Sequence, residues 1–270
     1  MFSSFTVFGK EISMYMIMTV LGGFALAAVV FGTAKKEIYR RDQLLHIMLA
    51  AAGGAFVGAH LLFLFTRLSL LKDVASNFSA YVRSFRDFLN VLVSLLGGMV
   101  FYGGLFGALI GGLLYCRNLK LDPLLYLDLF VPGIPLFHMF ARLGCLFAGC
   151  CFGVESEHGW YFPDSPVADP HVRYFPIQLV EAVGNLLIFL LLLALPKAKI
   201  PKGRMVWIYF PLYAVMRFTL EFWRGDAERG IYGGLSTSQW VSIFLLLLSA
   251  CTFLRDYLQR RKRSAEPGAA

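Results

Sequence analysis

Residues 138–156, HMFARLGCLFAGCCFGVES, place a histidine, an arginine and three cysteines in a stretch that is otherwise apolar or glycine-rich. An arginine at the centre of a bilayer costs about 3 kcal/mol on insertion scales, so such a residue is usually kept for function. A second arginine, Arg217, lies in another apolar segment. Because a guanidinium donates two parallel N–H groups to one anion, Arg142 and Arg217 favour a phosphate ligand, such as a phospholipid head group.

The polar groups of these two segments recur about one helical turn apart, so each set falls on a single helix face. One face carries His138, Arg142, Cys145 and Gly149, and the other carries Arg217, Glu221 and Arg224. The same spacing also permits a purely structural role. Arg217 would then pair with Glu221 one turn on, and Arg142 would pair with a carboxylate such as Glu181. The sequence leaves both roles open.

The cysteines of this region, Cys145, Cys150 and Cys151, could form a disulfide, ligate a metal, relay an acyl group or fill space. Adjacent cysteines make a strained bridge, and a separation of five residues takes Cys145 and Cys150 off one helical face. We therefore expect packing to be their main role. The sequence predicts no metal site and no cofactor, and serine at any one of these positions is expected to leave most activity.

The elements that must position these residues are membrane helices. The chain is 58% hydrophobic and 16% charged with a mean hydropathy of +0.65, whereas soluble domains carry about 25% charged residues. We predict an all-α integral membrane protein that forms one domain over residues 1–270. Seven apolar runs are long enough to span a bilayer: 12–33, 45–66, 91–115, 124–147, 176–196, 205–222 and 236–255. The fourth is predicted to be broken, because Asp128, Pro132, Gly133 and Pro135 interrupt it.

Lysine and arginine predict the orientation of these spans. Fifteen of them follow odd-numbered spans, including Lys197, Lys199 and a basic tail over 256–270, whereas eight, including Arg229, lie on the opposite face. The positive-inside rule therefore puts the N-terminus outside and the C-terminus in the cytoplasm. The net charge of +8 is mostly explained by this topology, and we find no nucleic-acid motif.

Two segments on the predicted outer side have structure of their own. Apolar residues recur at helical spacing through 74–90 (Phe78, Tyr81, Val82, Phe85 and Leu89), which is typical of an amphipathic arm on the membrane surface or of an ordinary connector. Residues 149–175 are rich in Pro, Gly, Asp and aromatic residues, which favours a compact outer loop or small head.

Polar residues of six spans fall in the predicted outer half of the membrane: Tyr15, His60, Tyr102, Arg142, Glu181 and Arg217. This common depth predicts a shared, partly hydrated cavity that opens toward the outer leaflet. Glycines and alanine near Tyr102 recur every four residues (103, 107, 111 and 104, 108, 112), which indicates close helix packing. A transporter for an anionic solute is the rival hypothesis, but such sites tend toward the bilayer midplane, and we detect no inverted repeat.

Four segments occur in an order that is similar to a known family: ARLGCLFAGCCFG (141–153), FPIQLVEA (175–182), RFTLEFWRGD (217–226) and LSTSQWVS (235–242). The chain resembles the prolipoprotein diacylglyceryl transferase family along nearly its whole length. The resemblance implies a bacterial inner-membrane monomer with its active site toward the outer leaflet. It also implies transfer of a diacylglyceryl group from phosphatidylglycerol to the lipobox cysteine thiol of a secreted prolipoprotein, with release of glycerol phosphate.

The resemblance assigns roles residue by residue. Arg142 and Arg217 match the essential arginines, and further matches are Tyr15, Gly103, Gly104, Gly144, Gly153, Gln178, Glu181, Glu221 and Arg224. The departures fall where the family has polar groups: Tyr102 replaces a histidine, Cys145 an asparagine, Cys150 a glutamate and His60 an arginine. Either His60 or Glu181 supplies the base, or the histidine is dispensable, or the chain is a divergent paralogue with another acceptor.

Overall fold

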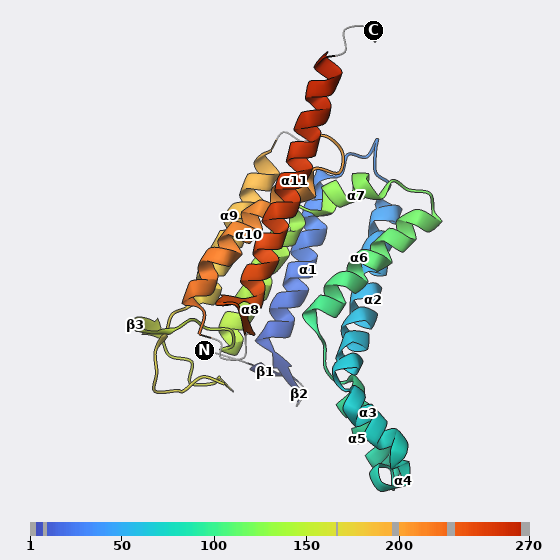
Figure 1. The fold of residues 1–270 in the computed structure, drawn as a ribbon. Helices are drawn as coiled ribbons and strands as arrows, with labels where there is room; N and C mark the ends of the chain where they lie inside the picture. The colour runs from blue at the N-terminus through green and yellow to red at the C-terminus, as the bar shows by residue number, and fades with distance from the viewer. Residues whose placement is uncertain (1–3, 8–9, 166, 196–199, 226–229, 266–270) are drawn as a thin grey trace. The chain divides into compact units, whose positions relative to one another are not determined.

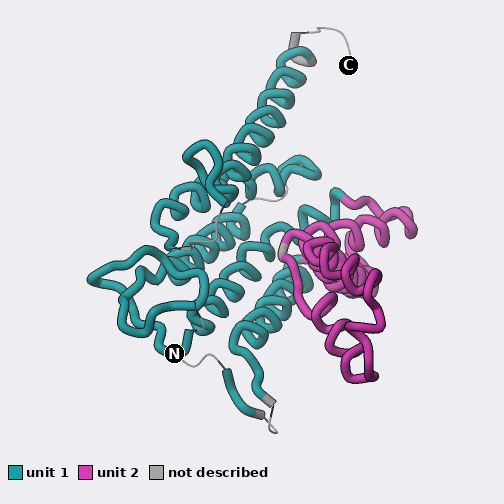
Figure 2. The backbone as a smooth tube through the Cα atoms, turned by 60° about the horizontal axis from the view of Figure 1, so that its bottom comes forward, with its two compact units in different colours: residues 1–33, 124–270 teal, residues 34–123 magenta. Residues whose placement is uncertain are grey.

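The structure is a computed structural model, and it describes residues 4–7, 10–165, 167–195, 200–225 and 230–265. The predicted basic positions Lys197, Lys199 and Arg229, residue Asp226 of the third family-like segment and the tail end 266–270 lie outside these residues. The chain divides into two compact units (Figure 2). Unit 1 comprises residues 1–33 and 124–270, and unit 2 comprises residues 34–123. Each unit is described by itself.

Unit 1 is built from long helices and small strands (Figure 1). Its helices are α1 (Met14–Thr33), α7 (Pro123–Phe130), α8 (Gly133–Ala148), α9 (Ile177–Ala194), α10 (Met205–Leu220), the 3-10 turn η2 (Glu221–Trp223) and α11 (Thr237–Ala265). Two antiparallel hairpins, β1 (Ser4–Val7) with β2 (Lys10–Ser13) and β4 (Ile231–Tyr232) with β5 (Leu235–Ser236), precede α1 and α11. The strand β3 (Glu155–Trp160) lies in the 149–175 segment.

Helix α8 is the centre of this unit because it packs against both α1 and α9, while α10 packs against α9 and α11. Small residues permit the close approach of α1. A Cβ on Gly144 would lie 3.2 Å from the Cα of Tyr15, and one on Gly22 would lie 3.0 Å from the Cβ of Phe140. Gly144, predicted as a site residue, thus positions α8 beside the start of α1.

The predicted break in the fourth span is confirmed, since α7 and α8 meet at a bend of 44°. Asp128, one of the residues that predicted the break, has a structural role at the same end. Its carboxylate accepts hydrogen bonds from the backbone N–H groups of Gly203 and Met205, the latter at 3.0 Å. Asp128 therefore satisfies donors at the beginning of α10, which a helix cannot satisfy internally.

A capping box begins α11. The Ser236 hydroxyl accepts from the N–H of Gln239 at 3.2 Å, and the Gln239 side chain accepts from the N–H of Ser236 at 2.9 Å. This reciprocal pair explains the LSTSQ sequence in physical terms. Helix α11 then continues to Ala265, ten residues past the end of the predicted span, so the first part of the basic tail is helical.

Unit 2 contains α2 (Arg41–Thr66), α3 (Leu68–Ser76), α4 (Phe78–Tyr81), α5 (Phe85–Leu96) and α6 (Phe101–Asn118). The prediction of one continuous third span over 91–115 is wrong, because the helix stops between Leu96 and Phe101. Gly97 closes α5 with a hydrogen bond to Val93, and the N–H of Val100 bonds to the carbonyl of Ala59 in α2 at 3.2 Å. A contact between helices thus replaces the helical hydrogen bonds at the break.

The prediction of one amphipathic helix in the 74–90 arm is also wrong. Helices α3 and α4 separate at Asn77, and α5 begins after Ser84. The Ser84 hydroxyl caps α5 by accepting from the N–H of Asp87 at 3.2 Å, so a new helix starts inside the apolar periodicity. The apolar side chains Phe78 and Phe85 remain exposed, at 54% and 76%. The arm thus keeps an apolar surface on shorter helices.

The described residues contain four helices that are long and apolar enough to cross a membrane: α1, α2, α9 and α11. The bent pair α7–α8 raises this count to five if the pair is one broken span. Helix α10 has 16 residues, which is short of the roughly 20 that a full span needs. The chain is therefore a mostly helical membrane protein.

The predicted glycine row of α6 packs against α2. A Cβ on Gly103 would lie 2.3 Å from the carbonyl oxygen of Gly58, and one on Gly107 would lie 2.1 Å from that of Gly54. Gly104 differs, because a Cβ there meets atoms only at 3.7 Å, an ordinary contact. Gly103 is thus a packing residue in this structure.

This difference makes a matched test of the two glycines. We expect Gly103→Ala to destabilise the protein by about 1–3 kcal/mol, because the added methyl overlaps backbone that cannot rotate away. Gly104→Ala should leave stability unchanged or slightly higher, since alanine favours a helix by about 1 kcal/mol over glycine. Thermal unfolding in detergent measures both. Equal melting temperatures of the two variants would contradict the packing role of Gly103.

Candidate active site

The predicted site residues of unit 1 gather at one end of its helices, which we call the head end because residues 149–175 join it. Arg142 and Cys145 lie in the last turns of α8, and Arg217 lies in the last turn of α10. Gln178 and Glu181 lie in the first turns of α9. Helices α1 and α11 begin at the same end, with Tyr15 and Ser238.

Arg142 is paired with Glu181 from the neighbouring helix. Its Nη2 lies 3.0 Å from Oε1 of the carboxylate, and the Glu181 side chain is almost completely buried, at 2%. The other carboxylate oxygen, Oε2, is buried without a hydrogen-bond partner among the described residues. Asn185, one turn further along α9, donates to the backbone carbonyl of Glu181 at 2.8 Å. Arg142 itself keeps 21% of its side chain exposed, so one side of the pair is accessible.

Arg217 is paired with Glu221 one turn on. The Nη1 to Oε2 distance is 2.7 Å, and both side chains are buried. The Nη2 group of Arg217 donates to the Ser238 hydroxyl at 2.9 Å, which ties the guanidinium to the first turn of α11. Arg224 approaches the same carboxylate, with Nε 4.0 Å from Oε2 of Glu221. The two ion pairs that the sequence offered as a structural role are therefore both present.

Cys151 lies near both ion pairs, since its thiol interacts electrostatically with Arg142 and with Arg224. We call the three arginines (Arg142, Arg217 and Arg224) and the two carboxylates (Glu181 and Glu221) the arginine series. Three guanidinium groups meet two carboxylates in this series, which leaves one net positive charge. A guanidinium has five N–H donors, and the carboxylates occupy only some of them. The arrangement can therefore still bind an anion.

The end of α8 brings the three cysteines together. Gly149 adopts φ +67°, and the N–H groups of Gly149 and Cys150 bond to the carbonyls of Leu146 (3.2 Å) and Cys145 (3.1 Å). This pattern is a Schellman motif, which normally sets two apolar side chains against each other. Here those side chains are Cys145 and Cys150. Helix α8 ends at Ala148, so the helical spacing used for Cys150 in the sequence analysis does not apply.

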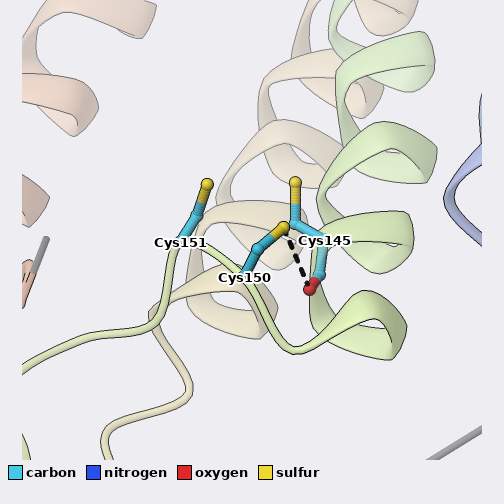
Figure 3. Close-up of side chains that lie close together, drawn as sticks. All are labelled: Cys145, Cys150 and Cys151. Atoms are coloured by element: carbon cyan, nitrogen blue, oxygen red, sulfur yellow. Dashed lines mark hydrogen bonds between the residues drawn. The ribbon is translucent and has the colours of Figure 1, made fainter. Parts of the chain in front are cut away.

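Cys151 completes the group because it also has a positive φ of 57°, which turns the chain back over the helix end. Figure 3 shows the sulfurs of Cys145 and Cys151 pointing in the same direction, with Cys150 directed toward Cys145. The three sulfur atoms lie within 4.8 Å of one another. The Cys150 thiol also contacts the Cys145 carbonyl at 3.8 Å.

The segment 149–175 packs over the end of α8, where Leu146 lies in one buried cluster with Phe162 and Ala168. Gly153 is enclosed by backbone: a Cβ there would lie 2.6 Å from the carbonyl of Trp223 and 2.7 Å from that of Phe175. The N–H of Gly153 bonds to Phe175 at 2.8 Å, and Gly153 pairs with Arg224 across an antiparallel bridge. Gly153 therefore acts through close backbone packing, which fixes Arg224 beside Glu221.

Gln178 anchors the cysteine turn to α9. Its amide donates to the carbonyl of Cys150 at 2.8 Å, and the residue is completely buried. Ser165 of the head donates to the carbonyl of Gly149 at 2.7 Å. Both peptide groups that flank the turn are thus held by residues distant in sequence.

Four predicted site residues belong to unit 2: His60, Tyr102, Gly103 and Gly104. The Nδ1 of His60 lies 2.8 Å from the Phe56 carbonyl, and Tyr102 begins α6 with 45% of its surface exposed. Their meeting with Arg142 and Arg217 stays a prediction, because the two units are described separately. Tyr15 lies in unit 1, where its backbone contacts Gly144.

Sequence reasoning missed two residues of the site. Ser238 binds Arg217, and Asn185 supports Glu181. Ser238 lies inside the LSTSQ segment, whose serines and glutamine indicated a helix start but not a contact with an arginine. Asn185 could have been found in the same way as Glu181, because it is also a polar residue within an apolar span and lies one turn further along the same helix.

The fold and this site define a helical membrane protein with a buried cationic centre at one end of its helices. Comparison with known proteins identifies its class more closely. The chain belongs to the prolipoprotein diacylglyceryl transferase family, since the model of that family matches residues 3–255. It is therefore a transferase of the type that acts in lipoprotein biosynthesis, and the resemblance found in the sequence is confirmed.

Relatives of this chain cover it almost completely. The phosphatidylglycerol–prolipoprotein diacylglyceryl transferase of Clostridium tetani is 30% identical over 259 residues, which are 95% of this chain and 98% of the relative. The phosphatidylglycerol–prolipoprotein diacylglyceryl transferase 2 of Clostridium perfringens is 31% identical over 262 residues, 96% of this chain and 97% of the relative. Both alignments thus extend over nearly all of this chain and of the relative.

Proposed function

We propose that this protein transfers a diacylglyceryl group from phosphatidylglycerol, or a similar anionic phospholipid, to the lipobox cysteine of a prolipoprotein. The family and the names of the relatives support the reaction. The observation that carries the proposal is the buried series of three arginines and two carboxylates, with its net positive charge beside three thiols. Such a centre suits a substrate whose phosphate must be held while it becomes the leaving group.

In this proposal Arg142 and Arg217 bind the phosphate and stabilise the charge that develops on it. Glu181, Glu221 and Ser238 are positioning residues, because they hold the two guanidinium groups. The buried free oxygen of Glu181 makes this residue a candidate base for the acceptor thiol. Tyr15, Gln178, Arg224, Gly144 and Gly153 shape the site around them, and His60 and Tyr102 would approach from unit 2.

A transfer assay tests the activity. Phosphatidylglycerol labelled in its diacylglyceryl part should transfer label to a lipobox peptide in the presence of the purified protein. The same peptide with serine in place of the lipobox cysteine should accept none, because its hydroxyl is a far weaker nucleophile than a thiolate. Absence of transfer to several lipobox peptides by folded protein would contradict the proposal and favour a divergent paralogue that modifies another acceptor.

We further propose seven spans, an N-terminus outside the cell membrane and a head end at the outer leaflet of a bacterial inner membrane, in a protein that works as a monomer. The distribution of basic residues supports this orientation. A membrane-impermeant thiol reagent applied to spheroplasts should therefore label a cysteine placed at Asp164 more than the parent protein. The same cysteine at Lys202 should add no label until the membrane is permeabilised. The reverse pattern would overturn the orientation.

A further inference from the structure

The sequence predicts packing and no metal site for the three cysteines, on the assumption that Cys145 and Cys150 lie off one helical face. The structure instead brings them together at the end of α8, and the phosphate-binding role leaves these three thiols without a function. Cys145, Cys150 and Cys151 have their sulfurs within 4.8 Å of one another (Figure 3). A Zn–S bond is about 2.3 Å long, so three sulfurs around one tetrahedral zinc ion lie about 3.8 Å apart. The observed group needs only a small contraction to reach that geometry.

We propose that Cys145, Cys150 and Cys151 form a three-thiolate Zn²⁺ site whose fourth position binds the thiol of the acceptor. Thiolates select soft or borderline ions such as Zn²⁺ and exclude Mg²⁺ and Ca²⁺. Catalytic zinc sites typically have three protein ligands and one open position. Cys145, in the last turn of α8, is buried, whereas Cys150 and Cys151 are half-buried, which leaves one side of the group accessible to a fourth ligand.

The surroundings support such a site in two ways. The backbone that carries the ligands is held in place, because Gln178 binds the carbonyl of Cys150 and Ser165 binds that of Gly149. The charge is also compensated. Three thiolates and one Zn²⁺ ion carry one net negative charge, and the Arg142 guanidinium interacts electrostatically with all three sulfurs. Arg224 does so with Cys151. The net positive charge of the arginine series therefore stabilises the net negative charge of the zinc site.

The site gives the proposed transfer a means of activating its nucleophile, and this step rests on the proposed function. A thiol that coordinates zinc loses its proton, so the acceptor binds as a thiolate, and its proton passes to the carboxylate of Glu181, the candidate base. Its sulfur then attacks the glycerol carbon of the phospholipid. The S–C bond forms as the C–O bond to the phosphate breaks, and the electron pair leaves with the phosphate on Arg142 and Arg217. The thioether product is uncharged and dissociates from zinc.

Metal binding by the unmodified protein is the first test, because it depends on no variant and on no transfer. Reduced, metal-free protein in detergent is titrated with Co²⁺ as a spectroscopic substitute for Zn²⁺. We expect a single equivalent to bind with a thiolate-to-cobalt charge-transfer band, which Zn²⁺ then displaces. A folded, reduced protein without this band would overturn the proposal, as would a disulfide among the three cysteines in protein isolated from membranes.

Cysteine variants locate the site. Serine at Cys145, Cys150 or Cys151 should weaken cobalt binding by about 100-fold or more, because each removes one of three ligands. Cys116→Ser and Cys251→Ser are the matched controls, since these cysteines lie in α6 and in the middle of α11, outside the group. They should leave the titration unchanged. A band that survives in the triple serine variant would overturn the assignment of the ligands.

The acceptor tests the fourth position. A lipobox peptide should change the cobalt spectrum, whereas the peptide with serine in place of cysteine should not, and an unchanged spectrum with both would overturn the binding of the acceptor thiol. Removal of zinc with a chelator should abolish transfer, and added Zn²⁺ should restore it.

Full transfer by zinc-free protein would overturn the role of zinc and leave the proposed function intact. A peptide-dependent spectrum in zinc-loaded protein that transfers no lipid would support the site and contradict the proposed function.

Discussion

We expect Arg142→Lys and Arg217→Lys each to lose about 100-fold or more of the transfer rate while the protein remains folded. Lysine keeps the positive charge, but its ammonium cannot donate two parallel N–H groups to one phosphate. Loss of one such donor to a developing negative charge typically costs a factor of about 10²–10³. The measurement is the initial rate of label transfer from phosphatidylglycerol to a lipobox peptide, with thermal unfolding recorded on the same samples.

Arg204→Lys is the matched control for this pair. Arg204 also forms an ion pair, with Asp256 of α11, but it lies at the other end of α10 from Arg217. Its substitution should leave the transfer rate within about twofold of the parent, because neither Arg204 nor Asp256 belongs to the arginine series. Wild-type rates for both Arg142→Lys and Arg217→Lys would show that bidentate binding of phosphate by these residues is not required.

Helical periodicity alone predicts much of the arginine series. Arg217 and Glu221 are four residues apart and Arg224 follows three residues later, so one helix would place them together, and they do meet. The series continues through η2, where the helix tightens, and the spacing survives because a 3-10 turn keeps residues three apart on one side. Arg142 and Glu181 lie on different helices, so their pairing depends on how α8 packs against α9. The apolar sequence predicts both helices but not which residues face each other across their contact.

Periodicity fails where a helix ends. The sequence analysis separated Cys145 from Cys150 by assuming a continuous helix, whereas Gly149 ends α8 with a positive φ and folds the chain back. A glycine that follows a helix, with cysteines four residues before and one residue after it, is a detectable signal of the Schellman contact. The position of Cys151 has no such signal, because a cysteine rarely adopts a positive φ and the head must hold it there.

Long-range contacts also decide the third span and the arm. The residues around Gly97 are apolar enough to continue a helix, and no local signal predicts that Val100 bonds to Ala59 instead. The Ser84 cap was visible in the sequence as a serine three residues before Asp87, but the apolar periodicity across it favoured one helix. In both places one specific hydrogen bond ends or starts a helix, although the apolar residues around it favour a continuous helix.

Arg217→Gln combined with Glu221→Gln should recover part of the stability that Arg217→Gln alone removes, because Arg224 still loses the Glu221 carboxylate, but none of the transfer. Removing one partner of a buried ion pair costs roughly 3–5 kcal/mol, because the other charge is left buried without compensation, whereas replacing both partners is often nearly neutral. Glu221 is 2% exposed and meets two arginines, so Arg217→Gln should lie near the lower end of this range.

Transfer separates the two roles of Arg217, since only phosphate binding requires the guanidinium itself. A purely structural ion pair predicts that the double variant regains wild-type transfer together with stability, and this result would rule out a phosphate-binding role for Arg217. Glu221→Gln alone completes the cycle. It keeps both arginines and should therefore retain more transfer than the double variant, although it leaves Arg217 and Arg224 without their shared carboxylate. Initial transfer rates and denaturation midpoints of all four proteins, measured in one detergent, give both coupling energies from the same samples.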